Sequence, residues 1–146
     1  MLSRPERSAI VVVSSSLGTR PFAGVMTYSA AKVCSSFMAQ ALNYELKEKI
    51  DVMSWESGAA GTKLFSEEQR VKLIPLGKAV DGMLHDLGHE SITSGTLPHD
   101  FSTWILRLLP LGTVQKMLFV AFTTVYRKEV EEINKGQQSL DEYIKR

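Results

Sequence analysis

The order of elements in the first 55 residues is the feature that most constrains the fold. Ala9–Ser14 is a continuous apolar run rich in β-branched residues, typical of a strand covered on both faces in a parallel sheet. After a loop with glycine and proline at residues 16–27, apolar residues recur at helical spacing over Tyr28–Lys49. Ile50–Trp55 then indicates a second strand. Strand, helix and strand form the smallest right-handed parallel crossover, so the sequence predicts an α/β fold.

The middle of the chain is predicted to be mostly helical. A helical pattern over Ser66–Leu87 is interrupted at Pro75 and Gly77, which predicts two helices with a break between them. Thr93–Pro98 is expected to form a short strand.

Residues 101–126 are apolar and aromatic and are expected to form helices, and residues 129–146 form a charged tail expected to be helical only to Asn134. Arg107 and Lys116 interrupt the apolar segment, so no stretch approaches the roughly 20 residues that a membrane-spanning helix needs. We expect a contact with a membrane surface or a docking surface there, and the alternative is an ordinary helix pair packed on the domain.

Composition limits the size of the core and the kinds of partner. With 146 residues, 44% of them apolar, the chain can bury one core. Its net charge of +1, with basic residues interleaved among acidic ones, disfavours nucleic-acid binding. The one cysteine, Cys34, excludes an intrachain disulfide, and we expect it to be a small buried side chain in the alanine-rich helix.

A tyrosine and a lysine stand four residues apart at the start of the long helix. Tyr28 and Lys32 therefore project from one face, and an ammonium held beside a phenol favours the phenolate, which prepares the phenol for proton transfer near neutrality. Ser15 ends the apolar run AIVVVSS thirteen residues before Tyr28, and a loop can return its hydroxyl to the helix start. The alternative interpretation of the Tyr28–Lys32 pair is a solvated helix face, which needs no function.

The whole segment resembles the catalytic segment of the short-chain dehydrogenase/reductase family. The resemblance is carried by the apolar strand, by the spacing from Ser15 to Tyr28-Ser29-Ala30-Ala31-Lys32, and by Gly18 and Pro21 between them. It is closest to the branch of 17β-hydroxysteroid dehydrogenases and very-long-chain 3-oxoacyl-CoA reductases. It implies a Rossmann-like doubly wound parallel sheet and a cofactor that is NADP(H), or alternatively NAD(H).

The resemblance also assigns roles to individual residues. Ser15 would polarise a substrate carbonyl, Tyr28 would deliver the proton, and Lys32 would support Tyr28 and bind the nicotinamide ribose. The loop after the second strand corresponds to the family's Pro-Gly-x-Val-x-Thr segment, which contacts the nicotinamide end of the cofactor. Here Gly58 and Thr62 are kept, while Ser57 and Ala60 replace the Pro and the Val, and Glu56 precedes the loop where an apolar residue is usual.

The family's N-terminal glycine-rich turn, TGxxxGxG, does not occur in this sequence. That turn receives the dinucleotide phosphates. The resemblance therefore covers the C-terminal half of the family, and we expect this fragment by itself to be inactive and to bind dinucleotide weakly or not at all. We divide it into a partial Rossmann-like catalytic half-domain, residues 1–100, and an apolar helical segment with a charged tail, residues 101–146.

The expectations for substrate, partners and location also rest on the resemblance. The resemblance implies a reductase of lipid or steroid metabolism, acting on a 3-oxoacyl-CoA or an oxosteroid, at the endoplasmic reticulum membrane or alternatively in the cytoplasm. We expect the helix over residues 28–46 to pair with another subunit or with a second copy in a homo-oligomer. The competing class of function is a catalytically silent half-domain that serves only in such interactions.

A second motif indicates metal chemistry only weakly. His85-Asp86-Leu87-Gly88-His89 resembles the zinc-protease pattern His-Glu-x-x-His, but aspartate is a shorter base and Gly88 weakens a helix. A third ligand would have to be a residue such as His99. We predict no metal site and expect His85 and His89 to end a helix, where positive charge is favourable.

Overall fold

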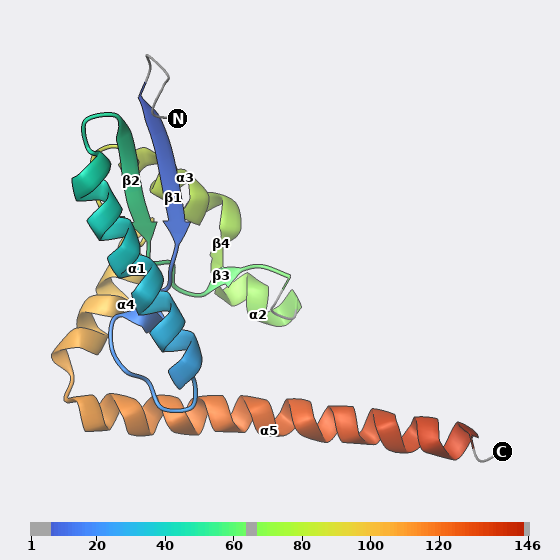
Figure 1. Cartoon of the computed structure of the whole chain (residues 1–146). Coiled ribbons are helices and arrows are strands. Elements are labelled where there is room, and N and C mark those ends of the chain that lie inside the picture. Colours follow the sequence, from blue (N-terminus) through green and yellow to red (C-terminus); the bar gives the residue numbers. More distant parts are fainter. Residues whose placement is uncertain (1–6, 64–66, 145–146) are drawn as a thin grey trace.

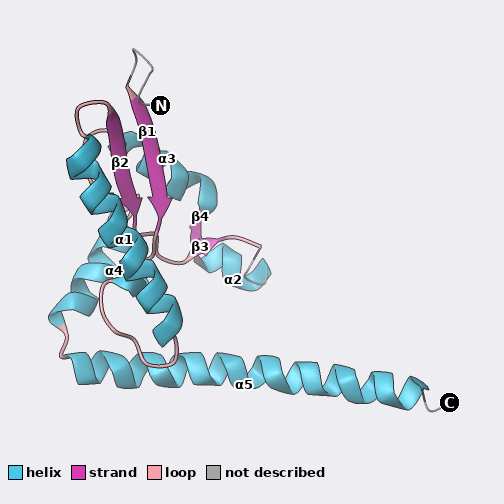
Figure 2. Cartoon of the chain, viewed as in Figure 1, coloured by secondary structure: helices cyan, strands magenta, loops and turns pink. Residues whose placement is uncertain are grey.

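Parallel strands form the main sheet of the computed structural model, which describes residues 7–63 and 67–144 (Figures 1 and 2). The order is β1 (Ser8–Val13), β2 (Ile50–Trp55) and β5 (Ile92–Thr93). β1 pairs with β2 along its whole length, whereas β5 pairs only with the end of β2. The predicted α/β fold with a parallel sheet is confirmed.

Two helices cover opposite faces of this sheet. Residues of β2 alternate between them: Val52 packs with Ala39 of α1 (Met26–Leu46), and Met53 packs with Ala79 and Met83 of α3 (Leu76–Asp86). In Figure 1, α1 lies in front of the strands and α3 behind them. Burial on both faces explains why the strand sequences are continuously apolar.

Only a narrow face of α1 is buried. Its buried residues are Ser29, Ser36 and Ala39, while Phe37 and Tyr44 are exposed. The expectation that Cys34 is buried is wrong, because this residue lies on the part of α1 that does not face the sheet.

The predicted break between two helices is confirmed, although Gly77 lies inside the second helix. α2 (Glu67–Lys72) is followed by a short strand, β4 (Ile74–Pro75), which pairs with β3 (Ala60–Gly61). The strand expected over Thr93–Pro98 is largely wrong, since β5 ends at Thr93. Gly95 has a φ of +81° and makes a turn. Pro98 then stands in the first turn of the next helix, where its fixed φ is favourable.

Two helices complete the chain, α4 (Leu97–Leu108) and α5 (Leu111–Ile144). The start of α5 packs through Val114 on Phe22 and Val25 of the loop before α1, and the rest extends away from the sheet (Figure 1). The Arg20 guanidinium donates to the carbonyl oxygens of Leu106 and Leu109, at 2.6 and 2.8 Å, and so caps the end of α4.

The predicted end of the last helix is wrong. The sequence predicts a tail that is helical only to Asn134, whereas α5 continues to Ile144. One glycine inside a helix costs only about 1 kcal/mol, and the good helix formers on both sides offset it.

Candidate active site

The ends of β1 and β2 bring the two predicted site loops together at one edge of the sheet. The backbone N–H of Ser14 donates to the Trp55 carbonyl at 2.8 Å, and that of Ser16 donates to the Ser57 carbonyl at 3.1 Å. The loop after β1 therefore runs beside the loop after β2. In open α/β sheets, ligands bind outside this carboxyl edge.

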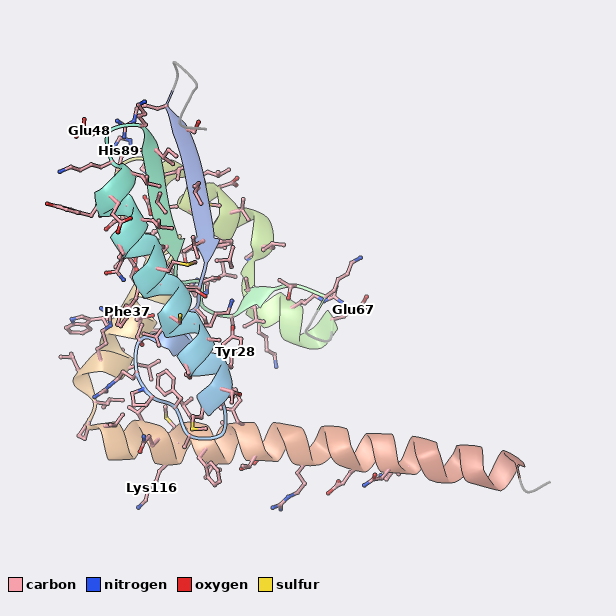
Figure 3. The ribbon with its side chains drawn as sticks, in the orientation of Figure 1. Tyr28, Phe37, Glu48, Glu67, His89 and Lys116 are labelled. Carbon is pink, nitrogen blue, oxygen red and sulfur yellow. The ribbon has the colours of Figure 1, made fainter. Side chains whose placement is uncertain are left out.

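Tyr28 and Lys32 lie on the first two turns of α1, close to the same edge. The Lys32 Nζ atom is 5.6 Å from the centre of the Tyr28 ring and donates to the Val13 carbonyl at 3.0 Å. Tyr28 is 45% exposed, so a substrate can reach it. Figure 3 shows Tyr28 near the N-terminal end of α1.

The loop with Ser15 is bonded to the same helix. The Ser14 hydroxyl donates to the Lys32 carbonyl at 2.7 Å. Gly18 packs against α1 so closely that a Cβ atom there would lie 2.9 Å from the Val33 nitrogen, which explains why glycine stands at this position. These contacts fix the start of α1 against the end of β1.

Ser15 is buried, and its Oγ accepts a hydrogen bond from the Leu17 N–H at 3.2 Å. This bond orients the hydroxyl and leaves its proton free for donation to a substrate. Within the described part of the chain no hydrogen bond joins Ser15 to the Tyr28 hydroxyl. The structure thus brings Tyr28 and Lys32 together and places Ser15 on the adjacent loop, and the catalytic roles of the three residues stay predictions.

His99 supports the loop that contains Gly58 and Thr62. Its Nε2 lies 3.2 Å from the Ala59 carbonyl, and its ring lies so close to Gly58 that a Cβ atom there would be 2.5 Å from a ring carbon. The Nε2 carries the proton in this bond, and the buried Nδ1 has no partner among the described residues. Sequence reasoning treated His99 only as a doubtful metal ligand, because nothing local connects it to a loop 40 residues earlier.

Glu56, the unusual residue at the end of β2, belongs to a polar network under α1. Its carboxylate accepts a hydrogen bond from the Ser36 hydroxyl at 2.6 Å and lies 3.8 Å from the Arg107 guanidinium. The Ser54 hydroxyl donates in turn to Ser36. The Glu56 side chain is only 12% exposed, and its contacts with Ser36 and Arg107 compensate the buried charge.

The predicted histidine pair does not share one helix. α3 ends at Asp86, so His89 lies beyond it, whereas the Nδ1 atom of the exposed His85 lies 3.2 Å from the Asp86 carboxylate. No group of three His, Cys, Asp or Glu residues in the described ranges has the geometry of a metal site.

The candidate site, which we call the rim, is the exposed carboxyl edge of the sheet with Ser15, Tyr28 and Lys32. One hollow in the surface is lined by residues 72–75 with Lys78, Thr96 and Pro98, and another by residues 51–53 and 88–91 with Asn43 and Lys47. Neither includes Ser15, Tyr28 or Lys32. None of the described helices is long and apolar enough to cross a bilayer.

Comparisons with known proteins identify relatives of this chain. The family model described as "short chain dehydrogenase" matches residues 1–72. A very-long-chain 3-oxoacyl-CoA reductase from Anas platyrhynchos is 32% identical over 121 residues, which is 81% of this chain and 38% of the relative. The chain thus spans well under half the length of that protein.

The fold also has a solved counterpart. It is similar to the crystal structure of the bulky-bulky ketone specific alcohol dehydrogenase from Comamonas testosteroni, with a TM-score of 0.50 and 24% identity over 70% of this chain and 43% of that one. At this identity the likeness concerns the fold alone. The family match over residues 1–72 and the reductase relative show that the chain belongs to the short-chain dehydrogenase/reductase family.

Proposed function

We propose that this chain forms the proton-transfer half of a carbonyl reductase that uses NADP(H) and acts on a lipophilic substrate, a 3-oxoacyl-CoA in the first place and an oxosteroid as the alternative. The observation that carries the proposal is the placement of Tyr28 beside Lys32, with the ammonium bonded to the end of β1. The reductase relative supports the choice of 3-oxoacyl-CoA.

The groups at the rim fit the nicotinamide end of such a cofactor. Lys32 donates one of its three ammonium hydrogens to Val13, and the others can bind ribose hydroxyls. The loop from Gly58 to Thr62, supported by His99, offers backbone groups and a threonine hydroxyl. Bound NADPH would supply the hydride.

The chain's own residues handle the carbonyl oxygen and its proton. Ser15 donates a hydrogen bond to that oxygen and stabilises the negative charge that develops on it. Tyr28 donates the proton as the charge develops, and Lys32 favours the resulting phenolate. In the direction of alcohol oxidation, Tyr28 takes the proton from the alcohol.

The experiment uses a chimera with the glycine-rich N-terminal part of a family member placed ahead of residues 1–146. We expect it to oxidise NADPH faster with a 3-oxoacyl-CoA than with an oxosteroid. The unfused chain should show little turnover, because it lacks the phosphate-binding turn. A chimera that binds NADPH yet reduces neither substrate would contradict the proposal.

A catalytically silent interaction module is the second candidate. It is favoured by the exposed apolar residues on α1, which include Phe37, Met38 and Tyr44, and by Val13 at the end of β1. Under this alternative, the 28–46 helix pairs with another subunit or a second copy. An NADPH-binding chimera without reductase activity would support it.

A location at the endoplasmic reticulum membrane belongs to the same proposal. It follows the resemblance to the reductase branch, and the exposed aromatic residues of α4, Phe101 and Trp104, support contact with a membrane.

A further inference from the structure

Helix α4 buries polar side chains where a helix ordinarily buries apolar ones. Its buried residues are His99 and Thr103, one turn apart on the same face, with 6% and 9% of their surface exposed. The His99 Nδ1 and the Thr103 hydroxyl have no hydrogen-bond partner among the described residues. Burying an unpartnered polar atom costs free energy, so an apolar side chain would be favoured if packing were the only requirement. Departures of this kind are expected at functional sites.

His99 reaches the loop that we propose for the nicotinamide. Its Nε2–H donates to the Ala59 carbonyl, with the nitrogen and the oxygen 3.2 Å apart, and its ring packs on Gly58. A planar trans peptide directs its C=O and N–H groups to opposite sides. Because His99 holds the carbonyl of the peptide between Ala59 and Ala60, the N–H of Ala60 points away from the histidine ring.

The helix that carries His99 is itself fixed against the rest of the site. The Arg20 guanidinium, from the loop that precedes α1, caps the C-terminal end of α4. The Arg107 guanidinium lies 3.8 Å from the carboxylate of Glu56, the residue that follows β2. Figure 1 shows α4 beside the carboxyl ends of the strands. A side chain on a helix that is held in this way can keep a loop in one conformation, which preorganises the binding groups of the loop.

We propose that His99 is a positioning residue for the nicotinamide end of the cofactor. Its Nε2–H holds the Ala59 carbonyl so that the N–H of Ala60 is directed at the carboxamide of the nicotinamide. A backbone N–H that is already oriented loses less freedom on binding and so contributes more to affinity. This inference rests on the proposed function, because it requires the loop from Gly58 to Thr62 to face the cofactor. His99 acts through this loop and needs no contact with the substrate.

Three substitutions of His99 separate the hydrogen bond from the packing of the ring. Glutamine can place an amide N–H where the Nε2–H of the histidine lies, whereas the amide of asparagine reaches only as far as Nδ1, and leucine has no donor. His99→Gln should therefore keep the bond to Ala59, and His99→Asn and His99→Leu should lose it. Thr103→Val is the matched control, since it removes a buried hydroxyl one turn further along the same face.

The experiment compares two ligands by isothermal titration calorimetry, on the chimera of the glycine-rich N-terminal part with residues 1–146. One ligand is NADPH, and the other is adenosine 2′,5′-bisphosphate, which lacks the nicotinamide. We expect His99→Asn and His99→Leu to weaken NADPH binding about tenfold, and His99→Gln and Thr103→Val to change it less than about threefold. Affinity for the bisphosphate should stay within about twofold of the parent in all the variants, because this ligand does not reach the loop.

Three results would overturn the positioning role. The first is an NADPH affinity of the asparagine and leucine variants equal to that of the parent, and the second is an equal loss of affinity for both ligands, which would show a general disturbance of the fold. The third is a His99→Gln variant as weak as His99→Leu, which would assign the effect to packing of the ring. Binding is measured without substrate, so an NADPH-binding chimera that reduces no carbonyl contradicts the proposed function alone.

Discussion

At the scale of residues, what distinguishes Tyr28 is its place in the fold. Tyr44 on the same helix also has a lysine against its ring, with the Lys47 Nζ 4.9 Å from the ring centre. Tyr44 near the C-terminal end of α1 and Lys47 just beyond that end are exposed, whereas Lys32 bonds to the end of β1. Spacing along the sequence predicts a Tyr–Lys pair, and the bond from Lys32 to the end of β1 distinguishes the pair that we propose for proton transfer.

The contact between Gly58 and His99 gives the first residue-scale prediction. In Gly58→Ala, the new methyl group would lie 2.5 Å from a ring carbon of the buried His99, so we expect a loss of about 1–3 kcal/mol in the free energy of unfolding. In urea denaturation, the same substitution in a His99→Ala background should cost clearly less. An equal cost in both backgrounds would show that the clash is not the cause.

At the scale of elements, the sequence correctly predicts the helices and strands whose signals lie within a short stretch of the chain. The boundaries of β2 and the start of α3 follow from an apolar run and from Pro75, and the structure has them where expected. The prediction for β5 and α4 is wrong, because it assigns Gly95 and Pro98 to a strand. In the structure Gly95 makes a turn, and Pro98 stands in the first turn of α4. The support of Gly58 by His99 could not be predicted, since it depends on how α4 packs on the β2 loop.

The link between α3 and β5 gives a pH prediction. The Thr93 hydroxyl donates to the Asp86 carboxylate and, with a further contribution from His85, lowers the pKa of Asp86 below its ordinary value. A carboxyl group whose pKa is lowered on folding adds stability above its ordinary pKa, and this stability is lost as the pH falls through the lower value.

We therefore expect Asp86→Asn to reduce the fall in stability on acidification below about pH 4. Asp81→Asn serves as the control, because Asp81 lies exposed on the same helix. Urea midpoints at a series of pH values measure the effect. If the two variants followed the parent equally well, Asp86 would have no part in the acid sensitivity.

At the scale of the whole molecule, the described fold is a sheet covered on both faces with reactive groups along one edge. β1 pairs only with β2 among the described residues, and α1 buries only a narrow face, so the site stands open to solvent on the side of Tyr28. An open site admits water, which weakens electrostatic stabilisation of a transition state. We therefore expect low turnover of the unfused chain and higher turnover of the chimera.

The most direct test of the account is the kcat/KM of the chimera for NADPH-dependent reduction of a 3-oxoacyl-CoA, with Tyr28→Phe compared with Tyr44→Phe. Each substitution removes the phenol oxygen of a tyrosine on α1 whose ring has a lysine beside it. The account predicts a loss of at least about 100-fold for Tyr28→Phe and less than about twofold for Tyr44→Phe. Equal activity of the Tyr28→Phe chimera and its parent would remove Tyr28 from proton transfer and contradict the account.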